Sequence, residues 1–114
     1  MGYIQAMNVA TLNALAEPNR LRIVELLRAN PFPVGEIAEK LGLRQPQVSK
    51  HLRVLNEAGI VDVQPVAQQR IYYLQEKPFK EIDAWLQSFW PTWEERLDSM
   101  EAFLGELQNQ AKEE

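Results

Sequence analysis

A chain of 114 residues, 46% of them hydrophobic, is long enough for one domain with a modest core, so we expect residues 1–114 to form a single domain. The absence of cysteine excludes disulfides, thiol redox chemistry and thiolate metal sites, and the absence of a long apolar run or a signal peptide predicts a cytoplasmic protein with no membrane partner. The formal net charge is −4, but residues 40–75 carry five basic and two acidic side chains, whereas residues 94–114 carry two basic and seven acidic ones.

Apolar residues recur at helical spacing in the first thirty residues and predict two helices. The apolar stripe of the first helix consists of Ile4, Val9, Leu12 and Leu15. Pro18 is expected to begin the second helix, because proline is best tolerated in the first helical turn. The second helix has a broad apolar face, which implies a central position in the core; this face consists of Leu21, Ile23, Val24, Leu26 and Leu27. A loop is expected over residues 30–33, where two prolines exclude regular helix.

Residues 34–55, VGEIAEKLGLRQPQVSKHLRVL, predict two short helices joined by a tight turn. Gly42 suits the left-handed conformation that ends a helix, because it has no Cβ. Pro46 lies in the first turn of the second helix. The apolar stripe of that helix consists of Val48, Leu52 and Leu55, and the opposite side is rich in amide, hydroxyl and basic groups. A short helix with an apolar back and such a front is typical of helices that lie in the major groove of DNA.

Two runs of β-forming residues follow and predict a hairpin over about residues 60–74, called the wing below. Its tip lacks the Asn-Gly or Asp-Gly pair that defines the commonest tight turn. Tyr72 and Tyr73 point to opposite faces, so one of them is expected to pack inside. Arg70 is the cation near the tip, and two interpretations stay open: a contact with DNA phosphate, or a solvated strand residue.

The last predicted element is a long helix over about residues 78–108, which Pro91 should kink or break. Its apolar residues form a seam with a seven-residue repeat. A chain of this size cannot cover such a seam, so we expect a twofold partner that is held by this helix and the first one. The expected interface residues are Leu12, Phe79, Ile82, Leu86, Phe89, Trp93, Leu97, Met100 and Leu104.

Several motifs in order carry a resemblance to a known family. They are LAEPNRLRIVELL at residues 15–27, GEIA at 35–38, QPQVSKHL at 45–52 and EAGIV at 57–61. Over roughly residues 10–75 the chain resembles the ArsR/SmtB family of bacterial winged helix-turn-helix repressors. The resemblance implies a mainly α fold with a small β-hairpin, in which four helices, the hairpin and a last helix follow one another. It also implies a homodimer formed through the terminal helices, and double-stranded DNA as the partner.

Many members of that family sense metals through cysteine or histidine clusters, but this chain has no cysteine and a single histidine. We therefore expect no metal site and no cofactor. Asp83, Asp98 and Glu101 could hold a hard cation in principle, although a solvated helix face is the simpler interpretation.

The predicted DNA-binding residues are Arg44, Gln45, Gln47, Ser49, Lys50, His51, Arg53 and Arg70. Glutamine side chains can pair with adenine edges, and lysine or arginine side chains with guanine or phosphate. Ser49 and His51 match the Ser-x-His-Leu motif of the family; His51 either contacts DNA or makes a structural hydrogen bond within the motif. Arg44 departs from the small hydroxyl residue that is common before Gln-Pro in the family, and this weakens the helix cap.

Other functions stay open at this point. One is a winged helix that binds protein rather than DNA. Another is a repressor released by an apolar effector among the aromatic residues Trp85, Phe89, Trp90 and Trp93, although such residues more often serve packing. An enzyme is not expected, because the sequence shows no nucleophile–base pair, glycine-rich phosphate loop or metal cluster.

Overall fold

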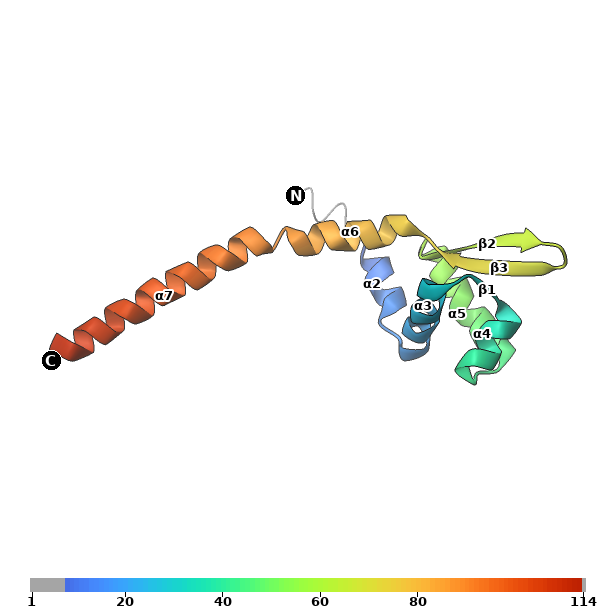
Figure 1. The fold of residues 1–114 in the computed structure, drawn as a ribbon, viewed down its shortest axis with the longest axis horizontal. Helices are drawn as coiled ribbons and strands as arrows, with labels where there is room; N and C mark the ends of the chain where they lie inside the picture. Colours follow the sequence, from blue (N-terminus) through green and yellow to red (C-terminus); the bar gives the residue numbers. More distant parts are fainter. Residues whose placement is uncertain (1–7, 114) are drawn as a thin grey trace.

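The computed structural model describes residues 8–113, which form a body over residues 8–75 and a long arm over residues 76–113 (Figure 1). The molecule measures 78 × 31 × 20 Å along its principal axes, because the arm projects far from the body. The predicted fold class, mainly α with a small β-sheet, is confirmed.

The body begins with helices α2, Val9–Leu15, and α3, Pro18–Ala29. Both begin at a side-chain cap: the Asn8 side chain accepts from the Ala10 N–H at 2.9 Å, and Glu17 accepts from the Arg20 N–H at 2.8 Å. Such caps satisfy backbone donors that have no partner within the helix. Pro18 lies in the first turn of α3, as predicted.

The apolar faces of these two helices differ in part from the predicted ones. Thr11 and Ala14 form the buried side of α2, while Val9 is 66% exposed. In α3 the buried residues are Ile23, Val24 and Leu27, and Leu21 is 47% exposed. A pattern of apolar residues does not tell which of two adjacent faces the core covers. Ile4 lies outside the described residues.

The segment expected to be a loop contains a two-residue strand, β1, Phe32–Pro33. β1 pairs antiparallel with β3, Gln69–Leu74, which in turn pairs with β2, Val61–Val66. The sheet therefore has three strands in the order β1-β3-β2, instead of the predicted hairpin alone. Proline is tolerated in β1 because the strand lies at the sheet edge.

Helices α4, Val34–Leu41, and α5, Gln45–Glu57, form the helix-turn-helix unit. Gly42 ends α4 with a φ of 67°, and its N–H donates to the Glu39 carbonyl oxygen, as the sequence predicts for a glycine after a helix. Val48, Leu52 and Leu55 are fully buried on one side of α5. Gly59, with a φ of 77°, follows α5 before β2 begins.

The core of the body is built where α3, α4, α5 and the start of β2 meet. Its largest fully buried side chains are Ile23, Ile37, Leu52, Leu55, Ile60, Val48 and Val61. Tyr72 of β3 packs against this cluster, as the alternation along the strand predicts for one of the two tyrosines.

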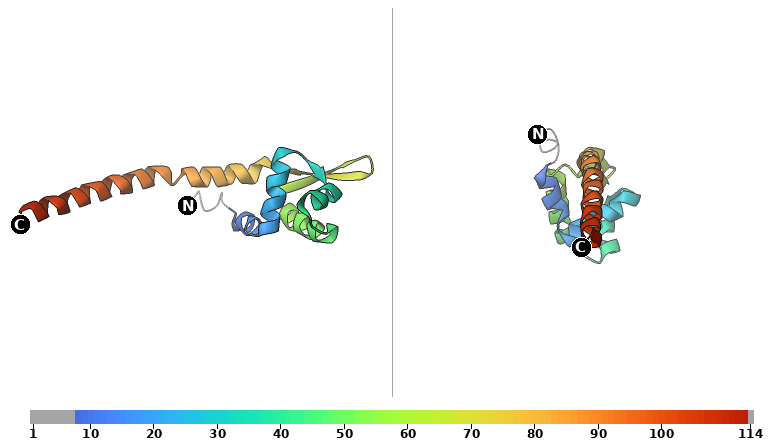
Figure 2. Two further views of the ribbon diagram at one scale, coloured as in Figure 1. Left: turned by 60° about the horizontal axis from the view of Figure 1, so that its bottom comes forward. Right: turned by 90° about the vertical axis from the view of Figure 1, so that its left-hand side faces the viewer.

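The arm consists of two helices, α6, Glu76–Gln87, and α7, Trp90–Glu113. The break lies just before Pro91, as predicted, but the helical segment begins earlier and ends later than residues 78–108 (Figure 2). At the start of α6, Glu76 lies 2.7 Å from the Lys80 ammonium; the hydrogen bond and the negative charge raise the pKa of Lys80.

The exposure of the apolar side chains changes along the length of the arm. Phe79 packs against the body core and Ile82 is half-buried, whereas Leu86, Phe89 and residues further along are exposed. Phe79 is therefore partly buried by its own chain, and its assignment to a dimer interface stays a prediction.

Candidate nucleic-acid interface

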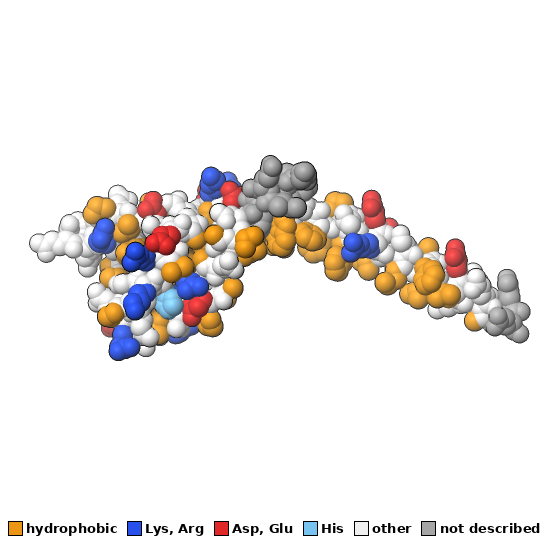
Figure 3. Space-filling model, turned by 180° about the vertical axis from the view of Figure 1, so that it is seen from behind, with side chains coloured by type: hydrophobic (Ala, Val, Ile, Leu, Met, Phe, Trp, Pro, Cys, Tyr) orange, Lys and Arg blue, Asp and Glu red, His pale blue; other side chains and the backbone are white. Residues whose placement is uncertain are grey.

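The side of α5 that points away from the core carries the polar residues predicted to bind DNA. Gln45, Gln47, Ser49, Lys50 and Arg53 are all exposed, because the opposite side is anchored by the buried stripe of the same helix. Figure 3 shows Lys and Arg side chains gathered over the body, while the arm is mainly apolar and acidic. The chain thus presents a cationic helix surface although its net charge is −4.

The first turn of α5 shows how the chain compensates for an unusual cap residue. Arg44 occupies the N-cap position, where a side-chain acceptor is preferred, and guanidinium has none. The Gln47 side chain instead bonds back to the cap residue: its Oε1 accepts from the Arg44 N–H at 3.2 Å. The Gln47 oxygen is therefore occupied by the helix start, while its NH₂ group is still free to donate.

Lys50 and Arg53 are one turn apart on the exposed side of α5, but their surroundings differ. The Arg53 Nε lies 3.3 Å from a carboxylate oxygen of Glu57, and both side chains are largely exposed. Within residues 8–113, no ion pair involves Lys50. The charge of Lys50 is therefore not offset by an ion pair within these residues, whereas Glu57 partly offsets the charge of Arg53.

His51 points sideways rather than outward. Its side chain is 20% exposed, and Nδ1 lies 3.7 Å from a carboxylate oxygen of Glu17, the residue that caps α3. This contact joins α5 to the start of α3 and lies outside the Ser-x-His-Leu motif, so both interpretations of His51 stay predictions.

Two arginines of α3 have roles that the sequence did not reveal. The Arg20 side chain donates to the Ala14 carbonyl oxygen at 2.6 Å, and Arg22 donates to the Leu41 carbonyl oxygen at 2.8 Å. These carbonyls lie at the ends of α2 and α4, where backbone acceptors have no helical partner. Arg22 therefore fixes the helix-turn-helix unit to α3.

The wing extends from the body beside α4, and its tip is exposed. Arg70 lies opposite Pro65 in the β2–β3 register, next to the exposed Gln69. The Ala67–Gln68 turn closes the hairpin, with a positive φ of 56° at Ala67. A positive φ at the first turn residue is the feature that type II′ hairpins require, and glycine normally supplies it.

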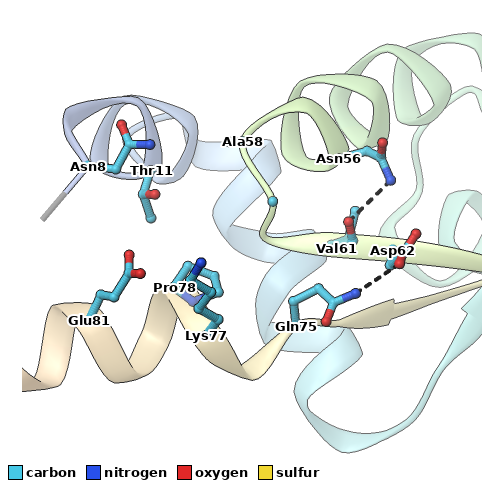
Figure 4. Close-up of a pocket in the computed structure, with 11 residues that line it drawn as sticks. Asn8, Thr11, Asn56, Ala58, Val61, Asp62, Gln75, Lys77, Pro78 and Glu81 are labelled. Carbon is cyan, nitrogen blue, oxygen red and sulfur yellow. Dashed lines mark hydrogen bonds between the residues drawn. The ribbon is translucent and has the colours of Figure 1, made fainter. Parts of the chain in front are cut away.

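A polar cavity of about 420 Å³ lies on another side of the body, between α2, the α5–β2 junction and α6 (Figure 4). Thr11 and Glu81 extend toward each other from α2 and α6. Gln75 donates to Asp62 at 2.9 Å, and Asn56 donates to the Val61 carbonyl oxygen at 3.2 Å. Asp62 also accepts from the Val63 N–H, so both of its oxygens have partners.

The aromatic residues considered for an effector lie at the α6–α7 junction. The rings of Trp85 and Phe89 pack edge to face with centroids 5.0 Å apart, which is a contact between neighbouring turns. An apolar effector at these residues stays a prediction.

Three acidic residues could in principle hold a cation, and two of them, Asp98 and Glu101, lie three residues apart on α7. Asp98 and Glu101 are exposed there, while Asp83 of α6 accepts from Gln87 at 2.9 Å. Within the described part of the chain, no group of three or more histidine and acidic side chains is arranged to hold a metal ion. None of the described helices is long and apolar enough to span a membrane.

Comparison with known proteins bears on these features. The sequence model of a family described as a helix-turn-helix domain matches residues 15–64. The chain is 48% identical over 65 residues to the biofilm growth-associated repressor of Agrobacterium fabrum, which covers 57% of this chain and 56% of that protein. It is 39% identical over 77 residues to the HTH-type transcriptional regulator Rv2034 of Mycobacterium tuberculosis, covering 68% of this chain and 72% of that one.

Two solved structures are similar in fold. The ArsR family transcriptional regulator RHA00566 has a TM-score of 0.66 at 27% identity, covering 75% of this chain and 88% of that chain. A homodimeric winged helix-turn-helix DNA-binding domain from Mycobacterium bovis has a TM-score of 0.61 at 25% identity, covering 79% and 81%.

The match to the Agrobacterium fabrum repressor covers little more than half of that protein. The family model matches residues 15–64, which include the helix-turn-helix unit and the start of the wing. The Rv2034 match covers more than two thirds of both proteins. Together with the observed winged helix-turn-helix fold and the exposed cationic side of α5, these similarities establish that the chain belongs to the ArsR/SmtB family of DNA-binding winged-helix transcriptional repressors.

Proposed function

We propose that the protein is a homodimeric repressor that binds a roughly palindromic operator, with one α5 helix of each protomer in successive major grooves. The helix-turn-helix unit, the wing and the arm act together as one domain in this proposal. Bound to the operator, the dimer blocks access of RNA polymerase to the promoter.

One observation carries the proposal: α5 presents its polar and basic residues outward on a rigidly packed helix. Val48, Leu52 and Leu55 are buried almost completely, so the orientation of the helix is fixed by the core. A rigid support of this kind favours base reading, because side chains that reach base edges need defined positions.

The contacts are assigned from the position of each side chain. Gln45 and Lys50 face outward without another partner in the described residues and are the base or phosphate contacts. Arg44 and Arg70 contribute positive charge at the two ends of the surface. Ser49 donates to phosphate, Gln47 offers its NH₂ group, Arg53 joins after leaving Glu57, and His51 supports the helix from behind.

The homodimer is supported by the arm. Its exposed residues include Leu86, Phe89, Trp93, Leu97, Met100 and Leu104, each at least 45% exposed. Exposed apolar surface of this extent marks an interaction site. The similar domain from Mycobacterium bovis is homodimeric. Leu12 of α2 is half-buried, so part of its side chain stays available to a partner.

Release from the operator does not use a thiolate-bound metal, because the chain contains no cysteine. The role is regulatory rather than catalytic, in agreement with the relatives that are named transcriptional regulators.

Selection from a random pool of duplex DNA tests this function. The purified protein should enrich an inverted repeat whose half-sites lie about one helical turn, roughly 34 Å, apart. Binding of the enriched duplex should weaken steeply with salt, since phosphate contacts release counterions. Absence of any enrichment at low salt would contradict DNA reading and favour a winged helix that binds protein.

A further inference from the structure

Helix α7 carries a row of exposed apolar side chains along one side. The exposed fractions of these side chains lie between 45% and 59%; the residues are Trp90, Trp93, Leu97, Met100, Leu104 and Leu107. Figure 3 shows apolar side chains along one edge of the arm, out to its far part. A helix whose apolar row lies in solvent requires a partner that covers it.

The spacing of this row identifies the kind of partner. Successive members are separated by three, four, three, four and three residues, which is the heptad pattern of a coiled coil. Trp90, Leu97 and Leu104 occupy the a positions, and Trp93, Met100 and Leu107 occupy the d positions. The pattern spans residues 90–107, which are 18 of the 24 residues of α7, so the partner is another helix of similar length.

The charges beside the row indicate a second copy of the same helix and its direction. Arg96 occupies a g position, and Glu94 and Glu101 occupy e positions. In a parallel pair, g side chains face e side chains of the following heptad, so Arg96 of each helix meets Glu101 of the other. An antiparallel pair would instead place e residues against e residues, and Glu94 would lie near Glu101. Charge complementarity therefore favours the parallel pair.

The length of the arm also favours a parallel pair. A helix rises about 1.5 Å per residue, so α6 and α7 together extend about 54 Å. The body lies at one end of the arm (Figure 1). If two α7 helices paired antiparallel over their whole length, the two bodies would begin about 70 Å apart, too far for successive major grooves at about 34 Å. A parallel pair brings both bodies to the same end.

We propose that α7 pairs with α7 of a second copy in a parallel, in-register coiled coil whose twofold axis runs along the arm. The inference rests on the homodimer proposed above and adds its direction and register. It implies that the reading helices flank the near end of the coiled coil, so DNA lies across that end.

Single cysteines test the register, because the natural chain has none. Leu97→Cys and Leu104→Cys should each form an intermolecular disulfide on mild oxidation, since in-register a positions face each other within disulfide distance. Asp98→Cys is the matched control: its position points away from the row, and it should stay unlinked. An antiparallel dimer that brings Glu94 near Glu101 has its midpoint between residues 97 and 98. It would leave the Leu104→Cys pair about 20 Å apart along the helix axis but keep the Leu97→Cys pair close, so Leu104→Cys decides the direction.

The oxidised products are read by denaturing electrophoresis, and the assembly of the reduced proteins by sedimentation velocity. A dimer in which Leu104→Cys does not link, whether or not Leu97→Cys links, overturns the parallel register but keeps the homodimer. A reduced wild-type protein that sediments as a monomer at all concentrations overturns both proposals.

A charge exchange provides a second variant set that leaves the core positions intact. Arg96→Glu alone and Glu101→Arg alone should each raise the dimer dissociation constant on the order of tenfold, because two symmetric pairs become repulsive. The double exchange should restore dimerisation. Two single variants that dimerise as the wild type does would contradict the pairing of Arg96 with Glu101.

Discussion

The polar side chains of α5 divide into those that hold the helix and those that are free for DNA. Gln47 completes the helix start that Arg44 cannot cap, Arg53 pairs with Glu57, and His51 lies beside Glu17. Sequence alone predicts which residue types face outward, because the stripe of Val48, Leu52 and Leu55 fixes the helix rotation. It does not predict local pairs, since these depend on neighbours from α3 and on rotamers.

Lys50 is the side chain whose loss should weaken operator binding most cleanly. Lys50→Ala should lower affinity and reduce the salt slope by about one, if it contacts a phosphate, with no change in thermal stability. Arg53→Ala should have a smaller effect, because Arg53 gives up its pair with Glu57 to reach DNA. Fluorescence anisotropy at several salt concentrations measures both. Lys77→Ala, an exposed cation on α6, is the control; equal losses in the Lys50 and Lys77 variants would contradict the assignment.

Gly42 gives a stability prediction at the helix-turn-helix bend. Its φ of 67° is costly for any residue with a Cβ, so Gly42→Ala should reduce the free energy of unfolding by about 1 kcal/mol. Gly105→Ala is the matched control: Gly105 lies within α7, and its added Cβ would meet no atom within 4 Å. Helix propensity predicts a gain of about 1 kcal/mol there. Thermal unfolding measures both; the same sign in both variants would contradict this account.

Among the secondary-structure elements, helices with a strong apolar periodicity were predictable from the sequence, and a strand of two residues was not. Helices α3, α4 and α5 were predicted from their apolar spacing, and the α6–α7 break from Pro91. The strand β1 was missed because two residues, one of them proline, show no alternation. A seven-residue repeat also does not distinguish Phe79, which the body partly buries, from the apolar residues that the arm exposes.

The wing tip shows a local cost that one substitution should relieve. Ala67 holds a φ of 56° in the turn between β2 and β3, where glycine is preferred. Ala67→Gly should therefore raise the free energy of unfolding by about 1 kcal/mol. Chemical denaturation measures the change, and Gln64→Gly within β2, which should destabilise, is the control. A destabilised Ala67→Gly protein would show that the turn does not carry this strain.

The whole molecule combines a small body, whose core fixes α5, with an arm whose apolar side chains from Leu86 onward are largely exposed among residues 8–113. The family and the fold were predictable, because ordered motifs and apolar periods are local properties of the sequence. The direction and register of a dimer were not, because they depend on which surfaces the folded body leaves exposed and on the charges beside the apolar row of α7.

The central claim is that one dimer places two α5 helices in successive major grooves of one operator. A series of duplexes, built on the selected operator, tests it by changing the distance between the half-sites. Inserting five base pairs, half a helical turn, should reduce affinity on the order of a hundredfold, to about that of a single half-site, because the second helix then faces the wrong side of the duplex. Affinity that is unchanged by the insertion would contradict a rigid twofold reader.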